Sequence, residues 1–165
     1  MQLLRINFNE YSMIQLEIMN TSQLYILLAD DDEDDCHFFQ EALDELSIAT
    51  RLTAVHDGEQ LMKLLTEKAS ELPHVLFLDL NMPRKNGYEC LREIKSSEQL
   101  KPLPVVILST SFERDVADRL YRDGASCCMR KPSGHDELKG LIQQALTLVM
   151  QESGSPPATD IVVVG

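Results

Sequence analysis

The chain reads Tyr25-Ile26-Leu27-Leu28-Ala29 and then, without a break, Asp30-Asp31-Asp32. A short and continuous apolar run is typical of a β-strand that is buried on both faces, as the strands of a parallel sheet are. Val75-Leu76-Phe77-Leu78 is a second run of this kind, and it ends on Asp79. Both runs therefore place carboxylates directly after a buried strand.

Amphipathic helices are expected between the strands, because apolar residues recur there at helical spacing. Strands are predicted over 25–29, 52–55, 75–78, 105–108 and 125–129, and helices over 39–46, 61–65, 88–95, 114–122 and 136–149. Parallel strands need right-handed helical crossovers, so five consecutive strand–helix units predict one fold class. That class is α/β, a doubly wound five-stranded parallel sheet with helices on both faces.

Functional groups collect at the carboxyl ends of the strands in such a sheet. The residues after the predicted strands are Asp30-Asp31-Asp32, Asp79, Ser109-Thr110 and Lys131-Pro132, whereas His56-Asp57-Gly58 after the second strand is interpreted as a turn. Carboxylates this close together repel one another unless a positive charge lies among them. Mg²⁺ prefers oxygen ligands of this kind and is the expected cofactor. The six acids from Asp30 to Asp35 also suit the positive end of a helix, so a solvated helix start is the alternative for that run.

The composition limits the classes of function. Fifteen Lys and Arg against 27 Asp and Glu give a net charge of −12, which argues against binding to nucleic acid or to an anionic membrane surface. The chain has no run of about 18 apolar residues and no secretory h-region. The four cysteines form no C-x-x-C pair and are not spaced with histidines as zinc ligands. We therefore expect a cytoplasmic protein with free, buried thiols.

One domain is expected, with an extension at each end. Residues 23–151 contain all five strand–helix units. Residues 1–22 alternate apolar and polar residues in two places, which predicts an N-terminal extension that is either a hairpin or loosely ordered. Residues 152–165 include the linker-like segment Ser153-Gly154-Ser155-Pro156-Pro157 and are expected to form a C-terminal tail.

Four motifs, in order, resemble those of the receiver domain of two-component response regulators. They are Ile26-Leu27-Leu28-Ala29-Asp30-Asp31, Leu78-Asp79-Leu80-Asn81-Met82-Pro83 with Gly87, Pro104-Val105-Val106-Ile107-Leu108-Ser109, and Lys131-Pro132. The resemblance spans residues 24 to about 150 and implies the flavodoxin-like receiver fold with strand order 2-1-3-4-5. The acid-rich start, Leu-Asn-Met-Pro and Ser-Thr-Ser resemble stand-alone receivers that partner phytochrome-like and hybrid histidine kinases.

The resemblance implies that Asp79 accepts a phosphoryl group from the phosphohistidine of a sensor histidine kinase or a phosphotransfer protein. Asp31 would ligate Mg²⁺ directly, Asp30 would act through a bound water, and the backbone carbonyl of Asn81 would supply another ligand, beside Asp79. Phosphoryl transfer needs positioning and charge neutralisation, with little covalent work from the protein. Beyond its own phosphorylation and dephosphorylation, the chain is therefore not expected to be an enzyme.

By the same resemblance, Lys131 would hold one phosphoryl oxygen, and Ser109 would hydrogen-bond another once Asp79 is phosphorylated. A cis peptide bond between Lys131 and Pro132 is also implied. One position departs from the family, because Cys128 stands where receivers usually carry Tyr or Phe, three residues before the lysine. The coupled motion of a hydroxyl and an aromatic ring is therefore expected to be altered or absent.

Output is expected through protein contact or by passing the phosphoryl group onward, because no DNA-binding or catalytic segment follows residue 150. In receivers the contact face is made by the fourth helix, the fifth strand and the fifth helix, here 114–122, 127–129 and 136–149. These segments and their borders carry both Arg and Asp residues, so the face can pair with a second copy of itself in a homodimer, or with a kinase.

Three alternative functions fit the sequence less well. A haloacid-dehalogenase-like phosphatase needs a second Asp two residues after the first, and this chain has Asn81 there. A flavodoxin-like cofactor binder needs a Gly-rich or hydroxyl-rich phosphate loop after the first strand, where this chain has six acids. A docking module that is never phosphorylated is expected to lack Asp79 or Lys131, and both are present.

Overall fold

The computed structural model describes residues 23–151 and 163–164, and strands and helices alternate along the first of these ranges. The strands are β1 (Leu24–Ala29), β2 (Thr50–Val55), β3 (Val75–Asp79), β4 (Val105–Ser109), β5 (Cys127–Arg130) and β6 (Val163–Val164). The helices are α2 (Glu33–Asp44), α3 (Gly58–Glu67), α4 (Gly87–Ser96), α5 (Arg114–Arg122) and α6 (His135–Gln151). The N-terminal extension predicted over 1–22 lies outside the described residues.

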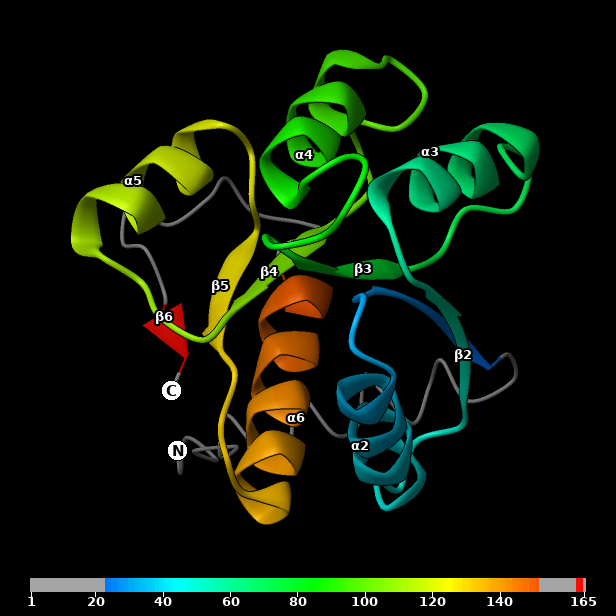
Figure 1. Ribbon diagram of the computed structural model, residues 1–165. Coiled ribbons are helices and arrows are strands. Elements are labelled where there is room, and N and C mark those ends of the chain that lie inside the picture. The colour runs from blue at the N-terminus through cyan, green and yellow to red at the C-terminus, as the bar shows by residue number, and fades with distance from the viewer. Residues whose placement is uncertain (1–22, 152–162, 165) are drawn as a thin grey trace, which may run out of the picture.

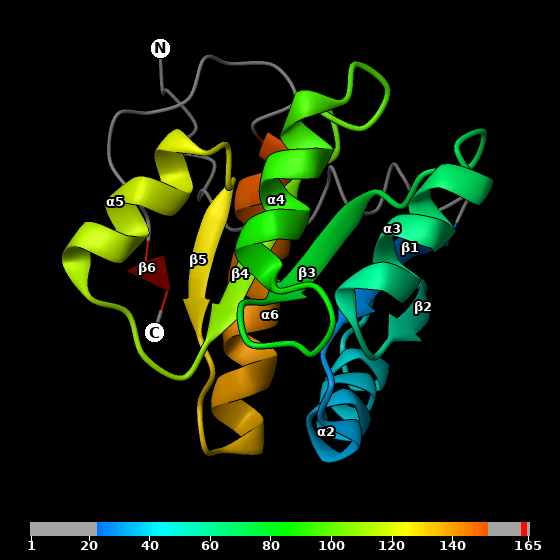
Figure 2. The ribbon, with the colours of Figure 1, turned by 45° about the horizontal axis from the view of Figure 1, so that its top comes forward.

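All strand pairs are parallel, and the sheet has the order β2-β1-β3-β4-β5-β6 (Figure 2). The predicted fold class and the order 2-1-3-4-5 are thus confirmed. β6 is an addition from the segment that the sequence presented as a tail, and it pairs with Cys128 and Met129 of β5. Helices α2 and α6 cover one face of the sheet, and α3, α4 and α5 cover the other (Figure 1).

The core has two halves, one on each face of the sheet. Every residue of β1, β3 and β4 is buried, which explains why these strands are continuous apolar runs. β2 is an edge strand with only Val55 fully buried, and its sequence is accordingly less apolar. Between α2 and the sheet, Phe39 packs edge-on against Phe77, with ring centroids 4.9 Å apart. The strand ends are therefore held on a rigid, close-packed base.

The predicted elements differ from the observed ones mainly at their boundaries. Helix 114–122 is as predicted, but the fifth strand begins at Cys127, two residues later than expected. Ala125 cannot join the strand because its N–H donates to the carbonyl of Leu120 and closes the end of α5. Gly124, at φ 101°, makes the left-handed turn that this helix ending requires.

The four cysteines are buried, as predicted, and none forms a disulfide within the described part of the chain. Within residues 23–151 and 163–164, no helix combines the length and the apolar composition that crossing a membrane requires.

Candidate functional site

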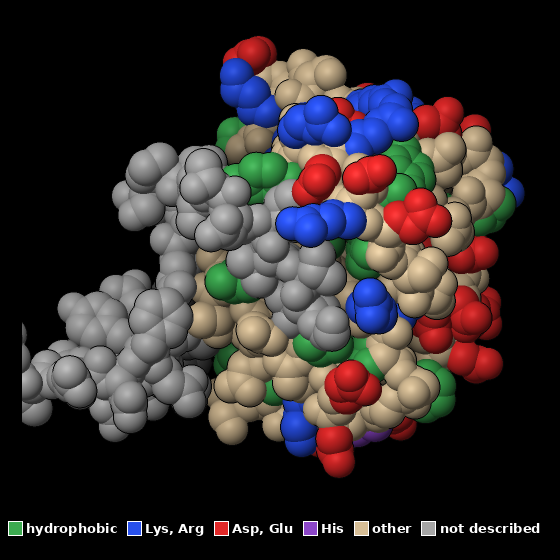
Figure 3. Space-filling model, turned by 90° about the vertical axis from the view of Figure 1, so that its left-hand side faces the viewer, with side chains coloured by type: hydrophobic (Ala, Val, Ile, Leu, Met, Phe, Trp, Pro, Cys, Tyr) green, Lys and Arg blue, Asp and Glu red, His purple; other side chains and the backbone are tan. Residues whose placement is uncertain are grey.

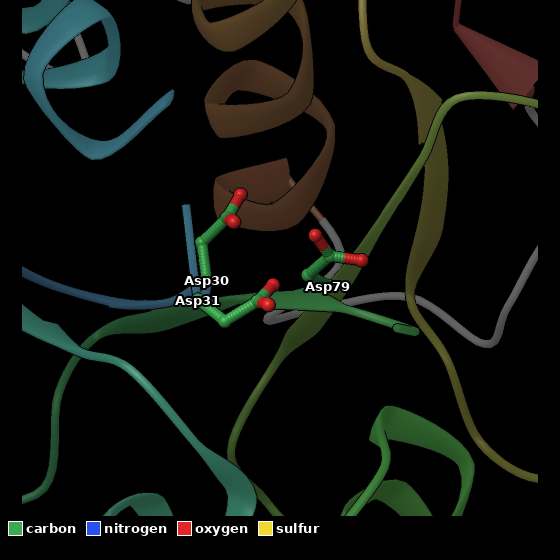
Figure 4. A group of neighbouring side chains, drawn as sticks. All are labelled: Asp30, Asp31 and Asp79. Atoms are coloured by element: carbon green, nitrogen blue, oxygen red, sulfur yellow. The ribbon is translucent and has the colours of Figure 1, made fainter. Parts of the chain in front are cut away.

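Three carboxylates meet at the carboxyl ends of two neighbouring strands. Asp30 and Asp31 follow β1, Asp79 ends β3, and these strands are paired along Ala29 and Leu78. One carboxylate oxygen of each lies within 4.8 Å of the others (Figure 4). Asp30 and Asp79 are only 1% and 6% exposed, whereas Asp31 is exposed. Asp30 and Asp79 therefore form the buried side of the cluster, and Asp31 forms its solvent-exposed side.

Lys131 supplies the positive charge of the cluster. Its Nζ donates to Asp30 at 2.6 Å, to Asp79 at 2.7 Å and to Asp35 at 2.8 Å. The side chain is 15% exposed, so these contacts lie in a region from which most water is excluded. The lysine comes from the β5–α6 connection, far along the chain from the acids, as the order of the strands in the sheet predicts.

Burial perturbs the protonation of this cluster. Removal from water raises the pKa of Asp30 to about 6, although the hydrogen bond and the charge of Lys131 act in the opposite direction. Burial also disfavours the charge on Lys131, but its hydrogen bonds to the three carboxylates outweigh burial and raise its pKa above the ordinary value. The Lys131 ammonium is therefore held in its charged form. One positive charge faces three carboxylates, so the cluster is net negative when all three are ionised.

The run of acids after β1 divides into two roles. Asp32 is not part of the carboxylate cluster: its side chain caps α2 by accepting hydrogen bonds from the N–H groups of Asp34 and Asp35. The helix-start interpretation therefore holds for Asp32, whereas Asp30 and Asp31 belong to the carboxylate cluster. Asp35, in the first turn of α2, was missed as a partner of Lys131, because sequence alone does not show which first-turn acid faces inward.

The loop after β3 orients the Asp79 carboxylate. The N–H of Asn81 donates to Asp79 Oδ1 at 2.9 Å, while Oδ2 accepts from Lys131. The N–H of Gly87 donates to the carbonyl of Leu80 at 3.0 Å, which folds the loop back over the strand end. Both oxygens of Asp79 therefore have a fixed direction, and Asn81 lies beside them.

Ser109 lies at the end of β4, next to Asp79, but its hydroxyl engages its own loop. Ser109 Oγ donates to the carbonyl of Ser111 at 2.8 Å, and the N–H of Ser111 lies 3.4 Å from the same Oγ. The hydroxyl is buried, with the residue 5% exposed. To bond a new group on Asp79, Ser109 would have to release Ser111.

The prediction of a cis Lys131–Pro132 bond is wrong, because every peptide bond in the described part of the chain is trans. The trans form is the intrinsic preference of an X–Pro bond by about 0.5–1 kcal/mol. Aiming the lysine requires no cis bond, since the N–H of Lys131 donates to the carbonyl of Ser109 at 2.8 Å and holds the residue beside the strand ends.

Comparison with known proteins agrees with this geometry. Residues 26–143 match the response regulator receiver domain family. The chain belongs to this family. Among curated proteins, response regulator Rcp1 of Synechocystis sp. is 34% identical over 122 residues, which are 72% of this chain and 83% of Rcp1. The probable chemotaxis protein CheY of Rhizobium etli is 27% identical over 73% of this chain and 91% of its own length.

Solved receiver structures superpose on the chain. The phosphorylated cyanobacterial phytochrome response regulator RcpA has a TM-score of 0.72 and 30% identity, and covers 82% of this chain and 99% of its own. The Mn²⁺-bound form of Rcp1 has a TM-score of 0.67 and 33% identity, and covers 81% of this chain and 99% of its own. The receiver thus belongs to two-component signalling, and its stand-alone homologues include phytochrome-associated regulators.

Proposed function

We propose that this receiver accepts a phosphoryl group on Asp79 from the phosphohistidine of a sensor histidine kinase or phosphotransfer protein, in a Mg²⁺-dependent reaction. The observation that carries the proposal is the buried Asp79 carboxylate with the Lys131 ammonium at 2.7 Å and two further acids beside it. In this family the first pair of acids binds metal, and the strand-end Asp is the phosphoacceptor. The chain has each of these residue types at the corresponding strand end.

The residues at the site fit a hard divalent cation. Carboxylate oxygens from Asp30, Asp31 and Asp79 converge within 4.8 Å, and one of the three acids faces solvent, which suits an ion that keeps several waters. Asp31 would bind the ion directly, Asp30 through a water, and Asn81 by its backbone carbonyl. When bound, Mg²⁺ would neutralise charge on the phosphoryl oxygens.

The protein's own groups would act by position. An Asp79 carboxylate oxygen attacks phosphorus, the new P–O bond forms, and the P–N bond to the donor histidine breaks. Lys131 stabilises charge on one phosphoryl oxygen, and Ser109 turns from Ser111 to donate to another. Transfer needs little else from the protein, so its chemistry is limited to forming and losing its own aspartyl phosphate.

Signalling would then proceed by protein contact or onward transfer, from a receiver domain over 23–151. The proposed contact face comprises α5, β5 and α6, and can serve a homodimer or a kinase. Seen from the α5 side, the described surface carries Lys and Arg side chains interspersed with Asp and Glu (Figure 3). A face that carries both charges can pair isologously with a second copy, with positive groups meeting negative ones. β6 lies within this face, because it pairs with the edge of β5 that does not pair with β4.

Intact-protein mass spectrometry tests the proposal. With Mg²⁺ and a small phosphodonor such as acetyl phosphate, the chain should gain about 80 Da, one phosphoryl group. Asp79→Asn should show no gain, and chelating the metal should abolish the gain in the wild type. No mass gain in the wild type, or an equal gain in Asp79→Asn, would refute the assignment of Asp79.

A further inference from the structure

The junction between β2 and α3, His56-Asp57-Gly58, touches both loops that carry the proposed metal ligands. His56 Nδ1 lies 3.1 Å from the carbonyl oxygen of Asp30, and because a carbonyl can only accept, Nδ1 carries the proton. Asp57 pairs with Arg84, which lies in the loop between Asp79 and α4. The sequence presented this junction as a simple turn, but its contacts reach the site from the side opposite Lys131.

The Asp57 carboxylate is fixed at both oxygens. Oδ1 accepts from the N–H of Gln60 at 2.8 Å and so caps α3, while Oδ2 accepts from Arg84 Nη2 at 2.5 Å. Asp57 is 1% exposed, whereas the Arg84 side chain is 55% exposed. The hydrogen bond from Arg84 lowers the pKa of Asp57, which keeps the carboxylate ionised. Arg84 is thus the solvent-exposed partner of the pair, and Asp57 is the buried one.

The backbone of the loop between β3 and α4 lies in close contact with the junction between β2 and α3. Arg84 has φ 64°, a left-handed conformation that is uncommon for a residue with a side chain and needs support from its surroundings. A Cβ on Gly58 would meet the carbonyl oxygen of Lys85 at 2.1 Å, so only glycine lets the loop approach so closely. The loop therefore rests on the start of α3 through both a close backbone contact and an ion pair.

The conformation of this loop sets the direction of the phosphoacceptor. Three residues before Arg84, the N–H of Asn81 donates to Asp79 Oδ1 at 2.9 Å, and the carbonyl of Asn81 is the proposed metal ligand. Any relaxation of Arg84 out of its left-handed conformation turns the peptide planes that lead back to Asn81. The N–H of Asn81 would then meet the Asp79 carboxylate at a different angle, and the carbonyl of Asn81 would point in a different direction from the proposed metal site.

We propose that the Asp57–Arg84 ion pair is a positioning element for the metal and phosphoacceptor site, acting through the loop that carries Asn81. The inference rests on the proposed function and adds a residue pair that touches neither metal nor phosphoryl group. Supporting contacts of this kind hold ligand groups in their binding geometry, so their loss weakens metal affinity without removing a ligand. The pair therefore contributes to Mg²⁺ affinity.

Three variants of the loop separate positioning from general stability. Arg84→Gln removes the charge and the pair, and Arg84→Lys restores a cation that can reach Asp57. Lys85→Gln is the matched control, because it removes an ion pair of the next residue, with Glu93 on α4, and leaves the backbone contact to Gly58 in place. Mg²⁺ affinity is measured by titration calorimetry with the metal alone, and unfolding midpoints are measured in urea.

Arg84→Gln should bind Mg²⁺ about three- to tenfold more weakly than the wild type, somewhat less than the usual loss for a group that contacts a ligand directly. The Mg²⁺ concentration for half-maximal phosphorylation should rise by the same factor. Arg84→Lys should recover part of the loss, and Lys85→Gln should match the wild type. A purely structural pair would lower the urea midpoint with unchanged Mg²⁺ affinity, and that result would overturn the inference.

The two proposals fail in distinguishable ways. If the wild type neither binds Mg²⁺ nor gains a phosphoryl group, the proposed function is wrong. If the wild type does both and Arg84→Gln equals Lys85→Gln in Mg²⁺ affinity, the proposed function stands and the positioning role is wrong.

Discussion

Replacing Lys131 by methionine tests the electrostatics of the site most directly. The change keeps an apolar stem but removes an ammonium that lies 2.6–2.8 Å from three carboxylates. At that separation and an effective dielectric constant of about 20, each contact has a gross Coulomb energy of about 6 kcal/mol. Most of this is offset by desolvation, and breaking a buried pair costs about 3–5 kcal/mol. Because Asp35 is partly exposed, we expect Lys131→Met to lower the free energy of unfolding by about 2–4 kcal/mol at pH 7 without metal.

Acid should reverse much of this loss. Burial raises the pKa of Asp30 to about 6, above its ordinary value of 3.8, so the folded protein binds this proton more tightly than the unfolded chain does. The destabilisation from Asp30 is therefore present at pH 7 and disappears as the pH falls from about 6 towards 4. In Lys131→Met the lysine no longer lowers the pKa of Asp30, so the recovery should begin at a higher pH and be larger than in the wild type.

Urea unfolding followed by far-UV circular dichroism, in EDTA between pH 4 and pH 8, measures both effects. Lys139→Met is the control, because that lysine pairs with Glu45 on the surface, where an ion pair contributes little. Saturating Mg²⁺ should stabilise Lys131→Met at pH 7 by supplying the missing charge. If the two lysine variants unfold at the same urea concentration at pH 7, Lys131 does not neutralise the acids and the reasoning is refuted.

Three further predictions concern the same edge of the sheet. Asp31→Asn should weaken Mg²⁺ binding by about tenfold or more in calorimetry, because it removes the proposed direct ligand; equal affinity would remove Asp31 from the site. Gly87→Ala should lower the free energy of unfolding by about 1–3 kcal/mol in urea, since the new Cβ would meet the carbonyl oxygen of Asp79 at 2.3 Å. Ser111 offers no carboxylate to orient the hydrolysing water, so the aspartyl phosphate should be lost at a moderate to slow rate. A bulky or an acidic residue at position 111 should change that rate, which is measured by the decay of the phosphorylated mass. An unchanged rate in both variants would contradict this.

The fold could be predicted from the sequence because burial on both faces imposes a simple pattern. A strand in the middle of a parallel sheet must be apolar throughout, as in β1, β3 and β4, and such runs stand out from helical spacing. The pattern says less where a strand is exposed or short. The start of β5 was predicted two residues too early, because a buried apolar residue such as Ala125 suits a strand and a helix end equally well. Only the hydrogen bond from its N–H to the carbonyl of Leu120 assigns Ala125 to the end of α5.

The site could be predicted as far as strand ends determine it. Asp30, Asp31, Asp79 and Lys131 lie together because parallel strands end at one edge, and the order of the sheet brings that lysine to the acids. Asp35 lies on a helix, where the angle of the helix to the sheet decides what it contacts. The Asp57–Arg84 pair joins loops 27 residues apart, and no local pattern encodes such a contact.

We expect the absence of an aromatic residue at position 128 to affect how a signal leaves the loop between β4 and α5. Ser109 and Ser111 are joined by the serine hydroxyl, so drawing Ser109 towards a phosphoryl oxygen would free the Ser111 peptide. The next residue is Phe112, partly buried against the apolar cluster that contains Cys128. Cys128 itself is 1% exposed, too small and too enclosed to swing between two positions as a ring does. A shift at Ser109 would therefore reach the core along the backbone to Phe112, on the loop itself, and not through a side chain of β5.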